Sequence, residues 1–167
     1  MRGKKRLLFV VILLTGCRTY PLTAEGRAGC DTSATAVSDG DPTMLPGSAC
    51  TTCHSAFTAA GTVFSTPSSG CSAGASGVRV EILDSTGRTA ITMITNSAGN
   101  FYTQERLPSP YRARVTATDG TSQTMSVAQT SGSCAHCHRL PPANAATGRI
   151  ATMVPTTIPD AGVGDAR

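Results

Sequence analysis

Four of the seven cysteines in this 167-residue chain stand in two copies of one short pattern. Residues 50–54 are CTTCH and residues 134–138 are CAHCH, so a histidine directly follows the second cysteine of each copy. This is the attachment pattern of c-type haem, in which two thiols reach the vinyl groups on one edge of a porphyrin and the histidine ligates the iron. Two of the three histidines occupy the required position. The pattern therefore predicts two covalently bound haem c groups.

Each predicted haem takes two sulfur atoms and one imidazole from the chain. The residues predicted to form the thioether bonds are Cys50, Cys53, Cys134 and Cys137, and those predicted to ligate the iron atoms are His54 and His138. His136 lies inside the second attachment loop and cannot reach its own iron, so it either ligates the first iron or faces solvent. Methionine is the other ordinary sixth ligand, and it raises the redox potential relative to histidine. The methionines that could fill this role are Met44, Met125 and Met153, whereas Met93 is expected in a strand, either in the core or on the sheet surface.

Two other interpretations of the cysteines stay open. The four cysteines of the two patterns are also the donor set of a four-thiolate metal site for an ion such as Zn. Alternatively, the six cysteines that follow Cys17 form three disulfides, with 15 connectivities allowed. Under the haem interpretation only Cys30 and Cys71 remain, and we expect a disulfide between them. A loop of that length predicts about 3–4 kcal/mol of stabilisation in the chain-entropy account.

The N-terminus predicts export. Four cations lie in the first six residues, and the apolar run Leu7–Leu14 follows them. This run is too short to span a bilayer as a helix but has the length of a signal-peptide core. It ends in Leu-Thr-Gly-Cys17, which resembles the lipobox of bacterial lipoprotein precursors. The resemblance implies a lipid anchor on Cys17 and a protein held at the outer membrane or the periplasmic or cell-surface face; an ordinary secretory signal is the alternative.

Charge and composition exclude several classes of protein. The net charge is +4, from 14 Lys plus Arg against 10 Asp plus Glu, but removal of the four N-terminal cations leaves equal numbers of both signs. A neutral chain has no basic stripe to neutralise phosphates, so we expect no nucleic-acid partner. Histidines committed to the attachment patterns leave none for a Ser-His-acid set. The glutamates Glu25, Glu81 and Glu105 are too scattered for a catalytic carboxylate pair, so we expect no enzyme.

The middle of the chain predicts short strands and no convincing helix. Residues 78–83 (VRVEIL) and 111–118 (YRARVTAT) alternate apolar and polar side chains, which is typical of half-buried strands. Asp119-Gly120 predicts a tight hairpin turn. Further strands are expected at 61–65, 89–95, 101–103 and 121–127, and a last one at 149–154. The spacing predicts a small all-β protein, an antiparallel β-sandwich or Greek key with an irregular haem-binding loop at each end.

The order GTVFS, GVRVEILDSTG, TNSAGNFY and PYRARVTATDG resembles the carboxypeptidase regulatory-like domain. The resemblance covers residues 60–127 and implies a transthyretin-like sandwich that is non-catalytic. The expected organisation is a lipoprotein signal peptide (1–16), a tether (17–49), a first haem loop (50–59), the sandwich (60–127), a second haem loop (128–140) and a C-terminal tail (141–167).

These expectations combine into one functional hypothesis. The chain is expected to be a lipid-anchored, exported di-haem c-type cytochrome that transfers single electrons at the cell envelope. Its partners would be the membrane, through the lipid, and redox proteins that the sequence does not identify. The alternative is a non-catalytic surface lipoprotein whose sandwich has a structural or binding role and whose cysteines form disulfides or a metal site.

Overall fold

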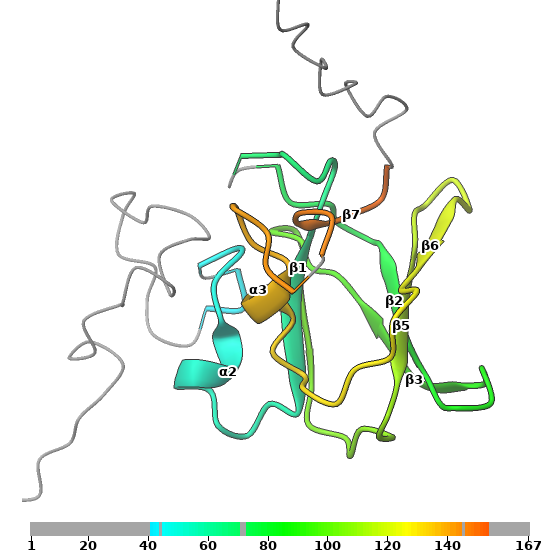
Figure 1. Cartoon of the computed structure of the whole chain (residues 1–167). Helices are drawn as coiled ribbons and strands as arrows, with labels where there is room; N and C mark the ends of the chain where they lie inside the picture. The colour runs from blue at the N-terminus through cyan, green and yellow to red at the C-terminus, as the bar shows by residue number, and fades with distance from the viewer. Residues whose placement is uncertain (1–40, 44, 71–72, 145, 154–167) are drawn as a thin grey trace, which may run out of the picture.

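The computed structural model describes residues 41–43, 45–70, 73–144 and 146–153, and in these it has two β-sheets packed face to face (Figure 1). One sheet has the strand order β4-β1-β7 and the other has the order β3-β2-β5-β6. The strands are β1 (Ala59–Phe64), β2 (Arg79–Leu83), β3 (Thr89–Ile94), β4 (Asn100–Thr103), β5 (Arg112–Thr116), β6 (Ser122–Thr124) and β7 (Ile150–Ala151). The predicted small all-β sandwich is confirmed.

The core lies between the two sheets and follows from the predicted alternation. Val80 and Ile82 of β2 point inward and are about 1% exposed. Val80 lies opposite Met93 of β3 and Val115 of β5, so three neighbouring strands contribute to one apolar layer. The buried cluster comprises Val63, Val78, Val80, Ile82, Ile91, Met93, Phe101, Tyr111 and Val115. Met93 thus lies in a strand, as predicted, and of the two places left open by the sequence it takes the core.

The polar face of β2 differs in part from the prediction. Arg79 is exposed, but Glu81 is only 7% exposed although the alternation places it on the solvent side. Its carboxylate accepts a 2.8 Å hydrogen bond from Nε of Arg114 on β5 and a second one from the hydroxyl of Thr89 on β3. A carboxylate can be buried at this place because both neighbouring strands supply donors.

Strand β1 is buried along its whole length. It pairs antiparallel with β4 and parallel with β7, so the sandwich is not wholly antiparallel. The predicted strand at 149–154 is present but shorter, at Ile150–Ala151. The other sheet covers one face of β1, and the two short helices α2 (Cys50–Cys53) and α3 (Cys134–Cys137) pack against it as well. The small side chains of Ala59, Ala60 and Gly61 suit this crowded position.

Several predicted features lie outside the described residues. These are the signal peptide at 1–16, the lipidated Cys17, the disulfide between Cys30 and Cys71, and Met44. In the part of the chain that the structure describes, no helix has the length and apolar character needed to cross a bilayer.

Candidate functional site

Each cysteine–histidine pattern forms one turn of α-helix, although the sequence predicts no helix there. We call residues 50–54 the first motif and residues 134–138 the second motif. The N–H of His54 donates to the carbonyl of Cys50 at 2.9 Å, and the N–H of His138 donates to the carbonyl of Cys134 at 3.0 Å. Residues three apart on a helical turn lie on the same face. In both motifs the two cysteines are therefore placed on one side of the turn, with the histidine at its C-terminal end.

The two motifs have nearly the same local backbone. The residue before the first cysteine has φ −78° and ψ 77° at Ala49, and φ −79° and ψ 84° at Ser133. The thiol of Cys50 contacts the carbonyl two residues before it at 3.4 Å, and the thiol of Cys134 does the same at 3.6 Å. Two segments more than 80 residues apart thus share the same backbone turn and the same contact of the first thiol.

Both motifs pack against β1, so they lie side by side and not at opposite ends of the sandwich (Figure 1). The N–H of Ala60 donates to the carbonyl of Gly132 at 3.0 Å, which fixes the start of the second motif on β1. A Cβ on Gly132 would stand 1.8 Å from the carbonyl oxygen of Thr58, and one on Gly61 would stand 2.9 Å from Cβ of Cys134. The second motif therefore reaches β1 because both contact positions are glycine.

The thiols of Cys50 and Cys134 are held in the protonated state at neutral pH. Burial raises the pKa of Cys134 to about 12, and the neighbouring Cys50 and Cys137 raise it further. Burial also raises the pKa of Cys50. Cys50, Cys134 and Cys137 form no disulfide. Because the thiolate is the form that attacks disulfides, the thiols of Cys50 and Cys134 exchange slowly at neutral pH.

One alternative interpretation of these cysteines is a four-thiolate metal site. Among residues 41–43, 45–70, 73–144 and 146–153, no group of three or more His, Cys, Asp or Glu side chains is gathered closely enough to hold a metal ion.

The imidazole of His138 is held by a single hydrogen bond. Its Nδ1 lies 3.0 Å from the carbonyl oxygen of Gly148. A carbonyl oxygen only accepts, so Nδ1 carries a proton, and in the neutral ring the lone pair is then on Nε2. A histidine that ligates a metal commonly donates its other ring N–H to a carbonyl in this way. His138 therefore has the tautomer that an axial ligand of iron requires.

The imidazole of His54 is held differently. Its ring stacks on the ring of Phe57, with centroids 4.8 Å apart, and Phe57 stacks on Tyr102 with centroids 4.4 Å apart. The chain turns after the first motif, where the N–H of Phe57 donates to the carbonyl of His54 at 3.0 Å. Within the described residues, neither ring nitrogen of His54 has a hydrogen-bond partner. Sequence analysis missed Phe57 and Tyr102; the aromatic residue three positions after His54 was the available signal.

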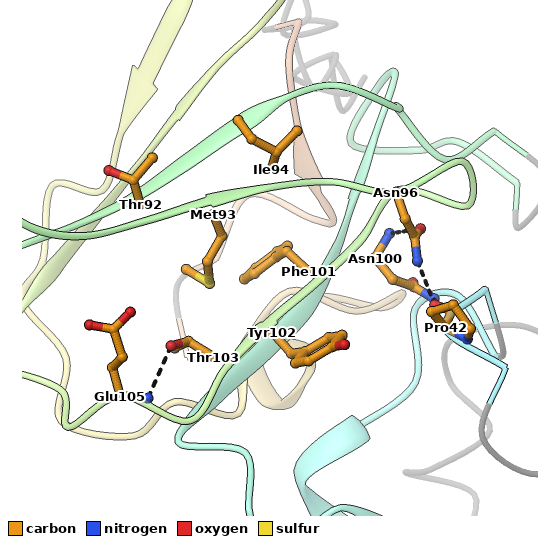
Figure 2. A pocket seen from close by; sticks show the side chains of 10 residues that line it. All are labelled: Pro42, Thr92, Met93, Ile94, Asn96, Asn100, Phe101, Tyr102, Thr103 and Glu105. Carbon is orange, nitrogen blue, oxygen red and sulfur yellow. Dashed lines mark hydrogen bonds between the residues drawn. The ribbon is translucent and has the colours of Figure 1, made fainter.

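The cavity beside the first motif is too small to enclose a porphyrin. A cavity of about 100 Å³ lies beside Cys50 and His54, lined also by Phe57, Phe101 and Tyr102. A wider, open hollow of about 420 Å³ lies between β3 and β4 (Figure 2), where Met93, Ile94 and Tyr102 line it, but none of its lining residues is Cys or His. Pockets that enclose a drug-sized ligand measure roughly 300–1,000 Å³. A haem on these motifs would be held by its covalent and axial bonds at the surface.

The described candidates for the sixth ligand are exposed or half-buried. His136 is exposed, as the solvent-facing alternative predicts. Met153 is 55% exposed, and Met125 is half-buried next to β6. The residues of both motifs thus supply thiols and imidazoles.

Comparison of this chain with protein-family models, with curated proteins and with solved structures finds no match. The similarity to carboxypeptidase regulatory-like domains stays a prediction from the sequence.

Proposed function

We propose that this chain is an exported, lipid-anchored di-haem c-type cytochrome that transfers single electrons at the cell envelope. The first motif and the second motif would each carry one haem c. The observation that supports this most strongly is the state of His138, whose Nδ1–H is committed to the carbonyl of Gly148 while Nε2 is left to bind. The lipid on Cys17 would keep the protein at the membrane, close to its redox partners.

The cysteines would perform the attachment. Each thiol would hold a vinyl group of the haem by addition of its S–H across the C=C bond: a carbon–sulfur and a carbon–hydrogen bond would replace the S–H bond and the π bond, with no change in the number of electrons. Burial that keeps the thiol of Cys134 protonated also protects it from oxidation before attachment. When bound, haem supplies an iron that gains and loses one electron.

The sandwich would serve as a rigid base for both sites. The two motifs contact the same fully buried strand, β1, and the hydrogen bond between Ala60 and Gly132 joins the segment of the second motif to it. Their relative position is therefore set by a core strand and not by a linker. Electron transfer depends steeply on distance, so a fixed separation suits two sites that exchange electrons.

Expression of the full chain with the c-type maturation machinery in a bacterial periplasm tests the proposal. We expect a red protein with a Soret band, an intact mass increased by two haems, and labelling of Cys17 by radioactive palmitate. Replacement of both cysteines of one motif by serine removes one haem, whereas Cys30→Ser with Cys71→Ser keeps both. A colourless, iron-free product from cells that load a control cytochrome overturns the proposal and supports the surface-lipoprotein alternative.

A further inference from the structure

The two proximal histidines differ in what holds them. His138 donates from Nδ1 to the carbonyl of Gly148 at 3.0 Å, whereas His54 is fixed by ring stacking on Phe57 and has no hydrogen-bond acceptor among the described residues. This contrast is unexpected because the backbones of the two motifs are otherwise so similar. We propose that it makes the two haems electronically unequal, with the lower redox potential at the second motif. The inference rests on the proposed function.

The direction follows from the chemistry of the imidazole. When Nδ1–H donates to a carbonyl oxygen, electron density in the ring rises and Nε2 becomes a stronger base. A more strongly donating axial ligand stabilises the oxidised iron more than the reduced iron. Hydrogen bonding to the axial ligand is one of the ways by which a protein sets the potential of a haem. His138 therefore favours the oxidised state of its iron more than His54 does.

The carbonyl of Gly148 is held in place by several contacts. The next residue, Arg149, donates its N–H to the carbonyl of Pro67 at 3.1 Å, and its guanidinium lies 4.4 Å from the centre of the Phe64 ring. Strand β7 begins immediately afterwards and pairs with β1. Gly148 itself has φ +117°, a conformation that favours glycine, and a Cβ there would lie 2.9 Å from the carbonyl oxygen of Pro67. The acceptor for His138 is thus part of a fixed segment.

The stack at the first motif orients the ring without polarising it. The planes of His54 and Phe57 are inclined by 20°, and those of Phe57 and Tyr102 by 13°. Stacked aromatic faces restrict the rotation of a ring, but they give no acceptor for its N–H. Phe57 is therefore a positioning residue for His54, and Gly148 is a positioning residue for His138.

Single-haem proteins separate the two sites. Cys50→Ser with Cys53→Ser leaves the second motif loaded, and Cys134→Ser with Cys137→Ser leaves the first. Each protein is saturated with imidazole so that both irons have the same sixth ligand, and it is then titrated with dithionite, which gives one electron per iron. We expect a lower midpoint potential for the haem on His138. In the ferric cyanide adduct, NMR of ¹⁵N-histidine protein should show slower exchange of the Nδ1 proton with D₂O at His138 than at His54.

Gly148→Ala tests the cause. The added methyl group strains a left-handed position and pushes the segment from Pro67, so we expect the potential of the second haem to rise towards that of the first. The first haem should be unaffected. Gly120→Ala is the matched control, because Gly120 also has a positive φ, +90°, but its Cβ would meet no atom within 4 Å.

The outcomes distinguish the two proposals. Loaded proteins with equal potentials, with the higher potential at His138, or with equal proton exchange overturn this inference and leave the di-haem cytochrome standing. Failure of the wild-type protein to take up haem overturns the proposed function, and this inference with it. If Gly148→Ala does not fold, the potentials and proton exchange of the two single-haem proteins decide the matter alone.

Discussion

The hydroxyl of Tyr111 donates a 2.7 Å hydrogen bond to the carbonyl oxygen of Ser131, which lies three residues before Cys134. Tyr111 is 3% exposed and belongs to the apolar core, so this bond joins the core directly to the segment that carries the second motif. Burial raises the pKa of Tyr111, and the hydroxyl therefore remains a donor at all ordinary pH values.

Tyr111→Phe should lower the free energy of unfolding by about 1 kcal/mol, because one hydrogen bond to a partly exposed carbonyl is lost and the ring is kept. Urea unfolding followed by circular dichroism measures this loss. Tyr102→Phe is the control: its ring is 49% exposed and we expect a change within about 0.5 kcal/mol. Equal effects of the two substitutions would contradict the role given to the bond.

The ion pair between Glu81 and Arg114 predicts a loss of stability in acid. The hydrogen bond from Arg114 holds the pKa of Glu81 below its ordinary value of 4.5. The folded state thus binds the proton less readily than the unfolded state does. The contribution of the ion pair to the free energy of unfolding is therefore complete above pH of about 4.5 and disappears as the pH falls through the lowered pKa of Glu81.

Glu81→Gln should remove this part of the pH dependence. Below pH of about 4.5 the free energy of unfolding of the wild type should fall more steeply than that of the variant, and above it the wild type should be the more stable protein. Urea titrations at a series of pH values measure both curves. Glu105→Gln changes an exposed carboxylate without an ion pair among the described residues, so its curve should follow the wild type.

Gly132→Ala should displace the second motif from β1. The new Cβ would lie 1.8 Å from the backbone oxygen of Thr58, which cannot move without disturbing β1. Forced overpacking of this kind costs about 1–3 kcal/mol. Intact mass should show partial or complete loss of one haem, with the first motif still loaded. Gly70→Ala, where a Cβ meets no atom within 4 Å, should keep both haems; a fully loaded Gly132→Ala protein would show that contact with β1 is unnecessary.

Ile82→Ala should be among the most destabilising core substitutions. Ile82 is 1% exposed and lies in the central strand β2, so the change leaves a cavity and costs about 2–5 kcal/mol of unfolding free energy. Ile94→Ala, at a position that is 61% exposed on the neighbouring strand β3, should change stability by no more than about 0.5 kcal/mol. Denaturant midpoints of the two proteins give the comparison.

Strands with one buried face were predictable from the sequence. The alternation of Val78, Val80 and Ile82 marks β2, and Asp119-Gly120 marks the hairpin between β5 and β6, because each pattern reports local geometry. Strand β1 carries little alternation because it is buried throughout, and its position depends on β4 and β7, which follow it by many residues.

The chemistry-bearing residues were also visible in the sequence, but their arrangement was not. Spacing identifies Cys50 and Cys134, yet only the packing of α2 and α3 against β1 places the two cysteines beside the same strand. Likewise, the acceptor for His138 is a main-chain oxygen ten residues away, at Gly148, and no side-chain pattern signals it. Contacts of this kind depend on tertiary structure alone.

The late position of β7 has a consequence for biosynthesis. Every cysteine and histidine of both motifs is synthesised before Gly148 and β7, yet the backbone oxygen that orients His138 belongs to that later stretch. A truncation before Gly148, or a fusion that pulls β7 away from β1, would keep both attachment patterns complete. It would still leave the imidazole of His138 without its hydrogen-bond acceptor. The stretch from Gly148 to the end of β7 is therefore needed to orient the histidine of the second motif, although it contributes no reactive side chain to that motif.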